Sequence, residues 1–108
     1  MGTFQVYRDR GEQFRWRLRA GNHRTIADCG EGYVQKDDCL HGIELVRGGT
    51  GEVETYQDAG GGYRWRLRAA NGKIFADSGE GYASHANCTR AMATVKRVAP
   101  GARLDDQT

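Results

Sequence analysis

Arginine side chains in strict alternation are the residues of this sequence best suited to chemistry, and they occur in two nearly identical stretches. Residues 14–20 read FRWRLRA and residues 63–69 read YRWRLRA. Guanidinium groups bind phosphate and carboxylate and stack on aromatic rings, so a row of them suits the recognition of anions. Three interpretations are open: a basic surface for nucleic acid, part of an active site, or the ordinary pattern of a half-buried strand.

The alternation places two kinds of side chain on opposite faces of a β-strand. Phe14, Trp16, Leu18 and Ala20 fall on one face and belong to the predicted core, while the arginines between them fall on the other. A tyrosine on the preceding strand points to the same outward face. The candidate binding face therefore has eight members: Tyr7, Arg15, Arg17, Arg19, Tyr56, Arg64, Arg66 and Arg68.

Opposing carboxylates explain much of this arginine face without a ligand. A two-residue turn at residues 71–72, Asn-Gly, sets Ala70 opposite Lys73 and Arg66 opposite Asp77. Cross-strand pairs of opposite charge contribute about 0.2–1 kcal/mol each. The half-buried strand is therefore the preferred interpretation of the motif.

The same register in the first stretch sets Arg17 opposite Asp28. The last arginine of each stretch then covers an apolar residue, Arg19 over Ile26 and Arg68 over Phe75. Each tyrosine is expected near the first arginine of its stretch or a diagonal neighbour, where a cation–π contact can form. An arginine and tyrosine surface resembles the platforms on which single strands stack, but the two aspartates, with Glu54 on the same face, weaken that alternative.

Other reactive side chains do not assemble into a recognisable site. The histidines fall in a turn (His23), in a helix (His41) and near a helix start (His85), without metal-ligand spacing, so we expect no metal and no cofactor. Cys39 and Cys88 occupy matching apolar helix positions and are predicted to be buried. Cys29 ends a strand opposite Ser78, and we expect it to react faster than the other two thiols if that strand end is open.

Two Gly-Glu-Gly loops, residues 30–32 and 79–81, precede the predicted helices. Helix N-termini attract anions, but these loops match neither the P-loop nor the dinucleotide fingerprint, and their glutamates repel phosphate. We interpret them as turns. No Ser/His/Asp or paired-carboxylate arrangement is identifiable, so an enzyme is not expected.

The positions of these motifs follow from an internal repeat. A shift of 49 positions aligns residues 4–47 with residues 53–96 without a gap, and roughly two fifths of the aligned positions are identical. Two copies favour a closed pseudo-twofold pair within one domain, residues 1–108, because an open solenoid needs at least three repeats.

Each repeat reads as three strands followed by a helix. In the second repeat Ser84 is a natural N-cap, and the helix that follows buries Cys88, Met92 and Val95. The helix of the first repeat lacks such a cap and buries the equivalent residues: Cys39, Ile43 and Val46. The fold class is therefore α+β.

Composition narrows the class of partner only slightly. Sixteen Lys and Arg against fourteen Asp and Glu give a net charge of +2, far from the balance of dedicated nucleic-acid binders. There is no signal-like or membrane-spanning apolar run, and the three cysteines fit neither a disulfide framework nor a zinc site. We expect a soluble, cytoplasmic protein with reduced thiols and no membrane partner.

Several motifs together resemble the YegP-like family in its tandem form: Arg-Trp-Arg-Leu-x-Ala, the Asn-Gly turn, Glu-Gly-Tyr and a helix ending in Val-Lys-Arg. The resemblance spans nearly the whole chain. It implies a single antiparallel sheet with both helices on one face, and a C-terminal strand at residues 102–106 exchanged onto the first repeat. In that strand Ala102 and Leu104 share a face, with Leu104 as the anchor. The family has no assigned function, so the resemblance carries over no site residues.

The sequence thus predicts a small cytoplasmic binding or interaction module without enzymatic activity, whose partner is unknown. Single-stranded nucleic acid on the arginine and tyrosine face is the alternative, and a small-molecule enzyme a distant third. A protein partner fits the first prediction. We expect a monomer closed by its two repeats, with a homodimer as the other arrangement.

Overall fold

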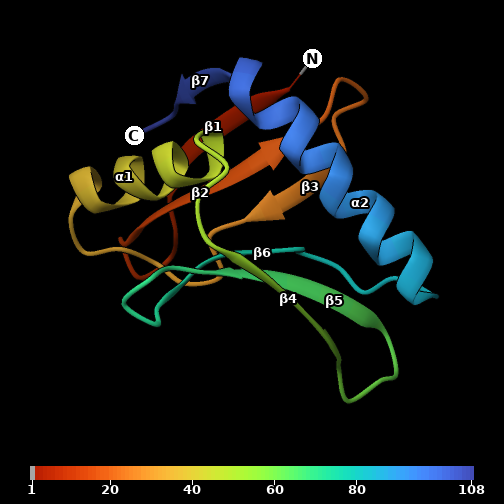
Figure 1. Cartoon of the computed structure of the whole chain (residues 1–108). Helices are drawn as coiled ribbons and strands as arrows, with labels where there is room; N and C mark the ends of the chain where they lie inside the picture. The colour runs from red at the N-terminus through yellow and green to blue at the C-terminus, as the bar shows by residue number, and fades with distance from the viewer. Residues whose placement is uncertain (1) are drawn as a thin grey trace.

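The computed structural model describes residues 2–108 and places two three-stranded units and two helices in the predicted order (Figure 1). The elements are β1 (Thr3–Arg8), β2 (Phe14–Arg19), β3 (Thr25–Asp28), α1 (Lys36–Arg47), β4 (Glu52–Gln57), β5 (Tyr63–Arg68), β6 (Ile74–Asp77), α2 (His85–Val98), a short 3₁₀ helix η1 (Ala99–Gly101) and β7 (Arg103–Asp106). The predicted α+β class and the repeated β-β-β-α order are confirmed.

All seven strands form one sheet in the order β4-β5-β6-β3-β2-β1-β7. The two three-stranded units meet at its centre, where β3 and β6 pair antiparallel through Asp28 and Asp77. These residues are 49 positions apart, as the pseudo-twofold relation between the repeats requires.

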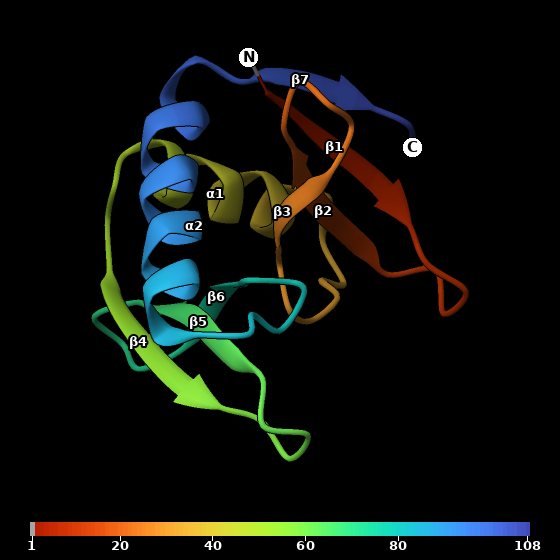
Figure 2. The ribbon, with the colours of Figure 1, turned by 90° about the vertical axis from the view of Figure 1, so that its right-hand side faces the viewer.

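The prediction of a wholly antiparallel sheet was wrong at one edge, because β7 pairs with β1 in parallel and the sheet is mixed. The chain leaves α2 through η1 and joins the sheet beside the start of β1, where the amide of Arg103 donates to the carbonyl of Gly2. From that point it runs in the same direction as β1. The predicted exchange of the C-terminal strand onto the first repeat is confirmed (Figure 2).

Leu104 is not the anchor of this strand. It is 50% exposed at the outermost edge of the sheet, beyond the cover of the helices, whereas Ala102 is 4% exposed and packs into the core just before β7 begins. The C-terminal segment is therefore held by its backbone pairing, by Ala102 and by the ion pair of Asp106 with Lys36.

The hairpin loops differ by one residue from the predicted two-residue turn. Ala69 donates to the carbonyl of Lys73, so three residues form the loop, and Gly72 takes a positive φ of 86°. A register shift between Leu67 and Arg68 compensates, so that Leu67 faces Ala76 and Arg66 faces Asp77 as predicted.

The residues at the outer end of each hairpin are therefore paired differently from the prediction. Arg19 lies opposite Thr25 rather than Ile26, and Arg68 lies opposite Ile74 rather than Phe75. The β-bulge is the physical reason, since it adds one residue to one strand of the pair.

Both helices pack on one face of the sheet and close the core. α1 contacts β2 and β6, and α2 contacts β5 and β3, so that each helix bridges the two repeats. Trp16 and Trp65 are fully buried beneath them. The side chain of Ser84 caps α2 by accepting from the amide of Asn87, as predicted. The helix residues that were predicted to be buried are all buried: Cys39, Ile43, Val46, Cys88, Met92 and Val95.

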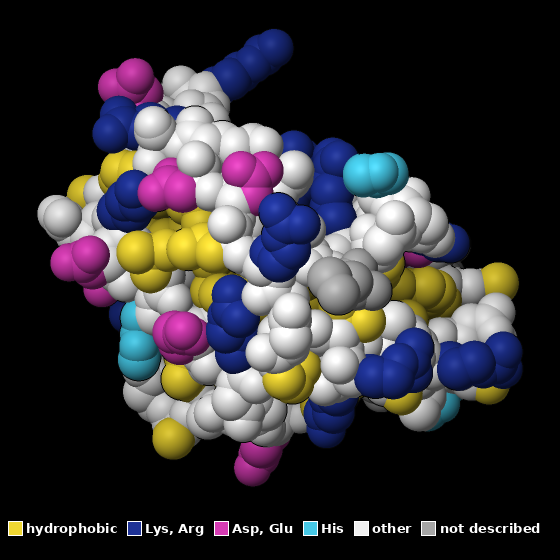
Figure 3. Space-filling model, turned by 90° about the horizontal axis from the view of Figure 1, so that it is seen from above, with side chains coloured by type: hydrophobic (Ala, Val, Ile, Leu, Met, Phe, Trp, Pro, Cys, Tyr) yellow, Lys and Arg dark blue, Asp and Glu magenta, His cyan; other side chains and the backbone are white. Residues whose placement is uncertain are grey.

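None of the helices within residues 2–108 is long and apolar enough to cross a membrane. On the upper side of the molecule, basic side chains are scattered among acidic and hydrophobic ones and do not gather into a single patch (Figure 3). This side of the molecule is thus mixed in charge, as the composition indicates.

Candidate binding face

The eight predicted residues lie on the face of the sheet opposite the helices, which we call the outer face. Along β2 and β5 the tryptophan and leucine side chains are buried, while the arginines between them are half-buried. The alternation of a β-strand produces this division directly. The two tyrosines come from β1 and β4, directly opposite the first arginine of each stretch.

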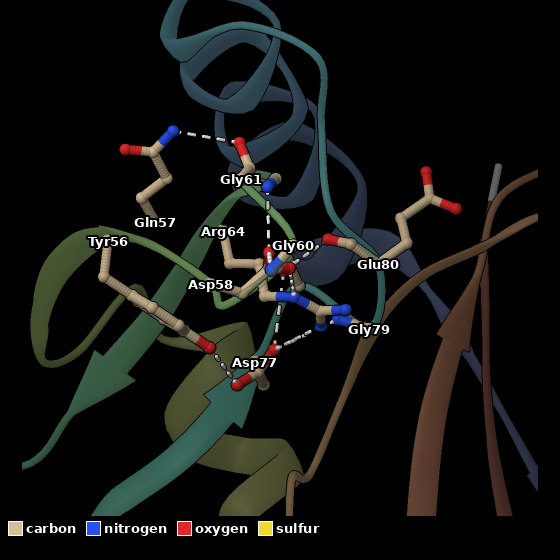
Figure 4. A network of polar contacts seen from close by, with 11 residues as sticks. Tyr56, Gln57, Asp58, Gly60, Gly61, Arg64, Asp77, Gly79 and Glu80 are labelled. Carbon is tan, nitrogen blue, oxygen red and sulfur yellow. Dashed lines mark hydrogen bonds and ion pairs between the residues drawn. The ribbon is translucent and has the colours of Figure 1, made fainter.

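In the second repeat Arg64 belongs to a network of polar contacts at the end of the hairpin between β4 and β5 (Figure 4). Its Nε donates to Asp58 Oδ2 at 2.8 Å, and its Nη1 lies 3.9 Å from Asp77 Oδ1. Asp58 also accepts from the amides of Gly60 and Gly62, which fixes the turn. The hydrogen bond from Arg64 is the main reason that the pKa of Asp58 lies below its ordinary value.

The other two arginines of the second repeat share one carboxylate. Arg66 Nε donates to Glu54 Oε1 at 2.9 Å, and Arg68 Nε donates to Glu54 Oε2 at 2.8 Å. These two hydrogen bonds, that from Arg68 first, lower the pKa of Glu54 to about 2. Every arginine of the second repeat on the outer face therefore has a carboxylate partner.

The first repeat copies only part of this arrangement. Arg15 donates to Asp9 Oδ2 at 2.6 Å, as Arg64 does to Asp58. Gln5 occupies the position of Glu54, however, and Arg17 Nε donates to its neutral amide oxygen at 2.8 Å. Arg19 Nε is buried and has no hydrogen-bond partner within residues 2–108. In that range neither Arg17 nor Arg19 forms a salt bridge, unlike their counterparts in the second repeat.

Each tyrosine carries a guanidinium group over its ring, from the diagonal arginine rather than the directly opposite one. Arg17 lies 4.8 Å from the Tyr7 ring centre, and Arg66 lies 4.8 Å from that of Tyr56. Tyr56 also donates its hydroxyl to Asp77 Oδ2 at 3.1 Å. Burial, followed by the charge of Asp77, raises the pKa of Tyr56.

Asp28 and Asp77 lie at the junction of the two repeats and face each other across the central strand pair. Asp28 accepts from the amide of Gly30 at 2.9 Å. Burial raises the pKa of the Asp28 carboxyl, and the neighbouring charge of Asp77 adds to this effect. The pairing of Arg17 with Asp28 across the strands is confirmed in register, but the charge of Asp28 is not used in a salt bridge among the described residues.

A hollow of about 470 Å³ lies beside Arg19, between the start of β1, the hairpin of β2 and β3, and β7. Its lining includes Arg103, His23 and the hydroxyl-bearing Thr3, together with one carboxylate, Asp105. Arg19 thus lines a recess that contains two arginine side chains, Arg19 and Arg103, and one carboxylate, Asp105. Sequence reasoning missed this recess because one of its walls is β7, whose residues are about 80 or more positions away in the sequence from the other lining residues.

The remaining sequence predictions concern reactive side chains. All three cysteines are free and buried. Cys29 is only 2% exposed, so the open strand end on which its faster reaction depends is not found. Burial raises the pKa of Cys39 to about 12. Gly30 and Gly79 have positive φ values, as turns require. Within residues 2–108 no three His, Cys, Asp or Glu side chains are grouped closely enough to hold a metal ion.

The difference between Gln5 and Glu54 is the feature of the site that sequence analysis left unused. The 49-residue shift places these two residues at equivalent positions, so the signal was present in the alignment of the repeats. Its meaning depends on the contact of Glu54 with two arginines at once. Glu54 contacts Arg66 directly opposite on β5 and Arg68 diagonally opposite. The alternation of the strands alone does not reveal the diagonal contact.

Comparison with known proteins gives the family of the chain but no activity. The solution NMR structure of yegP of E. coli, a protein of unknown function, has the same fold, with a TM-score of 0.88 and 29% identity over 99% of this chain and 93% of that one. The solution NMR structure of the UPF0339 protein SO3888 of Shewanella oneidensis also has this fold, with a TM-score of 0.84 and 24% identity over 97% of this chain and 90% of that one. The second likeness supports the fold alone.

Shorter relatives correspond to a single repeat. A UPF0339 protein of Neisseria meningitidis serogroup B is 45% identical over 47 residues, which cover 44% of this chain and 82% of that protein. A UPF0339 protein of Methanosarcina acetivorans is 51% identical over 47 residues, with 44% and 79% covered. The model of the domain of unknown function DUF1508 matches twice, at residues 9–56 and 58–106. The chain therefore belongs to the DUF1508 family and carries two copies of its domain.

Proposed function

We propose that this chain is a binding module without enzymatic chemistry, and that it recognises an anionic partner through the first-repeat half of its outer face. The observation that carries this proposal is the exchange of Glu54 for Gln5 between the repeats. It leaves Arg17 and Arg19 without the carboxylate that their counterparts share. The three buried free thiols favour a location in the reducing cytoplasm.

An incoming anion must compete with the protein's own acceptors for the guanidinium groups. In the second repeat an incoming phosphate or carboxylate must displace Glu54 from Arg66 and Arg68, so little binding energy remains. In the first repeat Arg17 needs to exchange only a neutral amide oxygen, and Arg19 forms no salt bridge within residues 2–108 that an anion would have to displace. A charge-assisted hydrogen bond to such a donor corresponds to about tenfold or more in affinity.

Single-stranded nucleic acid is the second candidate, and the stacking of Arg17 on Tyr7 favours it. The guanidinium group lies over the ring and extends a flat surface on which a base can stack, while Arg19 lines the neighbouring recess and supplies a positive charge for the adjoining phosphate. The net charge of only +2 leaves little long-range attraction. Any such complex should therefore be weak and strongly dependent on salt.

A reciprocal charge exchange tests both candidates. Gln5→Glu installs in the first repeat the carboxylate of the second, and Glu54→Gln removes it from the second; neither changes a buried core residue. We expect Gln5→Glu to abolish the binding of a labelled single-stranded oligonucleotide in low-salt fluorescence anisotropy, and Glu54→Gln to strengthen it.

Inorganic phosphate serves as a second probe in the same protein and separates a general anion site from a nucleic-acid platform. Phosphate binding without oligonucleotide binding supports the first candidate and removes the second. Binding of both probes that is indifferent to Gln5→Glu, or no binding of either at low salt, would contradict the proposed face.

The absence of enzymatic chemistry is part of the proposal, and so is the monomeric state. The two repeats pack against each other through both helices, so one chain completes the pseudo-twofold arrangement by itself. Light scattering after size exclusion should give the mass of one 12.0 kDa chain. A stable mass of two chains would overturn the monomer.

A further inference from the structure

The pseudo-twofold arrangement is broken at the two edges of the sheet. β7 lies along β1 at one edge, but within residues 2–108 no strand lies along the outer side of β4 at the other. β1 and β4 are equivalent strands, because each pairs with its neighbour in the same register: Thr3 faces Arg19, and Glu52 faces Arg68. The place that β7 takes beside β1 thus has an open counterpart beside β4 (Figure 2).

The backbone of β4 offers the same hydrogen-bonding groups as that of β1. β7 is joined to β1 through the carbonyls of Gly2 and Val6, which accept from Arg103 and Gln107. With a shift of 49 residues, the equivalent outward carbonyls are those of residues 51 and 55. Peptide groups alternate in direction along a strand, so the outward amides of β4 belong to Val53 and Thr55.

The side chains beside this edge are also left uncovered. Phe4 and Val6 on β1 are fully buried, whereas Val53, the counterpart of Phe4, is 38% exposed. Thr55, the counterpart of Val6, is exposed as well. A β-strand with unpaired peptide groups and an exposed apolar side chain is a template for the addition of a further strand.

The side chains around β4 indicate which type of residue fits at each position of an added strand. Glu52 is exposed and would face its first residue, which favours a basic side chain there. Val53 would face an apolar second residue. Glu54 already holds two arginines, so a neutral third residue fits best.

The fourth residue of the added strand would meet the start of α2. In the first repeat Asp106 of β7 forms an ion pair with Lys36 at the start of α1. His85 occupies the equivalent position in α2, and its Nε2 lies 3.5 Å from Thr55 Oγ1 on β4. A helix N-terminus and an imidazole both favour an acidic side chain at this point.

We propose that the β4 edge binds an extended segment of a partner protein, which runs parallel to β4 and presents basic, apolar, neutral and acidic residues in succession. A second copy of this chain fits less well. Its β7 is already paired with β1 and would set Asp105 opposite Glu54. Antiparallel pairing of two β4 strands centred on Glu54 would set glutamate opposite glutamate, a destabilising contact.

The experiment uses the full chain and a nine-residue peptide whose centre is Arg-Val-Thr-Asp, with a peptide of reversed sequence as the control. In ¹⁵N NMR spectra the forward peptide should shift the β4 amides, and hydrogen exchange of the Val53 and Thr55 amides should slow by about tenfold or more. The reversed peptide should do neither.

A matched pair of variants tests the backbone role of the edge. Thr55→Pro removes an outward amide that β5 does not use, and it should weaken binding about tenfold or more. Thr55→Val keeps the amide and should retain binding. Unchanged β4 amides at millimolar peptide, or displacement of β7 in place of binding at β4, would overturn the proposal. Shifts of the β4 amides that depend on protein concentration alone would assign the edge to a second copy instead.

Discussion

Deletion of residues 103–108 removes β7 and tests how far the C-terminal strand stabilises the first repeat. The strand makes four residue pairs with β1, and hydrogen bonds of 2.9 and 2.8 Å join its two ends to Gly2 and Val6. At about 0.5–1 kcal/mol for each pair the deletion should cost about 2–4 kcal/mol. For a domain of this size the melting temperature should then fall by about 10–20 °C.

Thermal unfolding followed by circular dichroism measures this change, and light scattering measures its second consequence. The deletion exposes the edge of β1, whose peptide groups can then pair with another molecule, so self-association should increase. Leu104→Ala is the control, because it keeps the backbone of β7. A melting temperature and a monomer mass that are both unchanged by the deletion would refute the strand-exchange account.

Further predictions follow from particular side chains. Leu104→Ala should cost less than about 1.5 kcal/mol in denaturant unfolding, because Leu104 is half exposed. Cys29, Cys39 and Cys88 should all react slowly with a thiol reagent in the native state, as timed mass spectrometry would reveal; rapid labelling of Cys29 would contradict its burial. The depressed pKa of Glu54 contributes stability that is fully present above its unfolded value near 4.5 and is lost as pH falls toward 2; Glu54→Gln should flatten this acid dependence.

Periodicity and capping made most of the fold predictable. The alternation of residues 14–20 placed Trp16 and Leu18 in the core, and the hydroxyl of Ser84 marked the start of α2. These signals are local, because strand alternation and helix capping depend on residues within a few positions of each other. The equivalence of the repeats then transferred each assignment from one half to the other.

The sequence predictions were wrong at positions whose structure depends on tertiary contacts. The alternation of the C-terminal strand and the family resemblance together predict Leu104 as its anchor, but the side chain lies at the edge of the sheet and is 50% exposed. The Asn-Gly turn at residues 71–72 predicts a two-residue loop, yet a bulge after Leu67 adds one residue and restores the register. The parallel direction of β7 depends on the path of η1, which no short sequence pattern encodes.

The sequence predicted which residues form the candidate face, but not that the two repeats differ in how their arginines are paired. All eight side chains lie on the outer face, as the alternation indicates. The difference between the two halves comes from one residue, Gln5 in place of Glu54, and its effect becomes visible only when both Arg66 and Arg68 are found on the same carboxylate.

The most direct test of the central claim observes the arginine side chains themselves. In ¹⁵N spectra of the guanidinium Nε–H groups, titration with inorganic phosphate at low salt should shift the signals of Arg17 and Arg19 and leave those of Arg66 and Arg68 in place. Equal shifts in both repeats, or shifts confined to Arg66 and Arg68, would contradict the claim that the first repeat carries the available anion-binding groups.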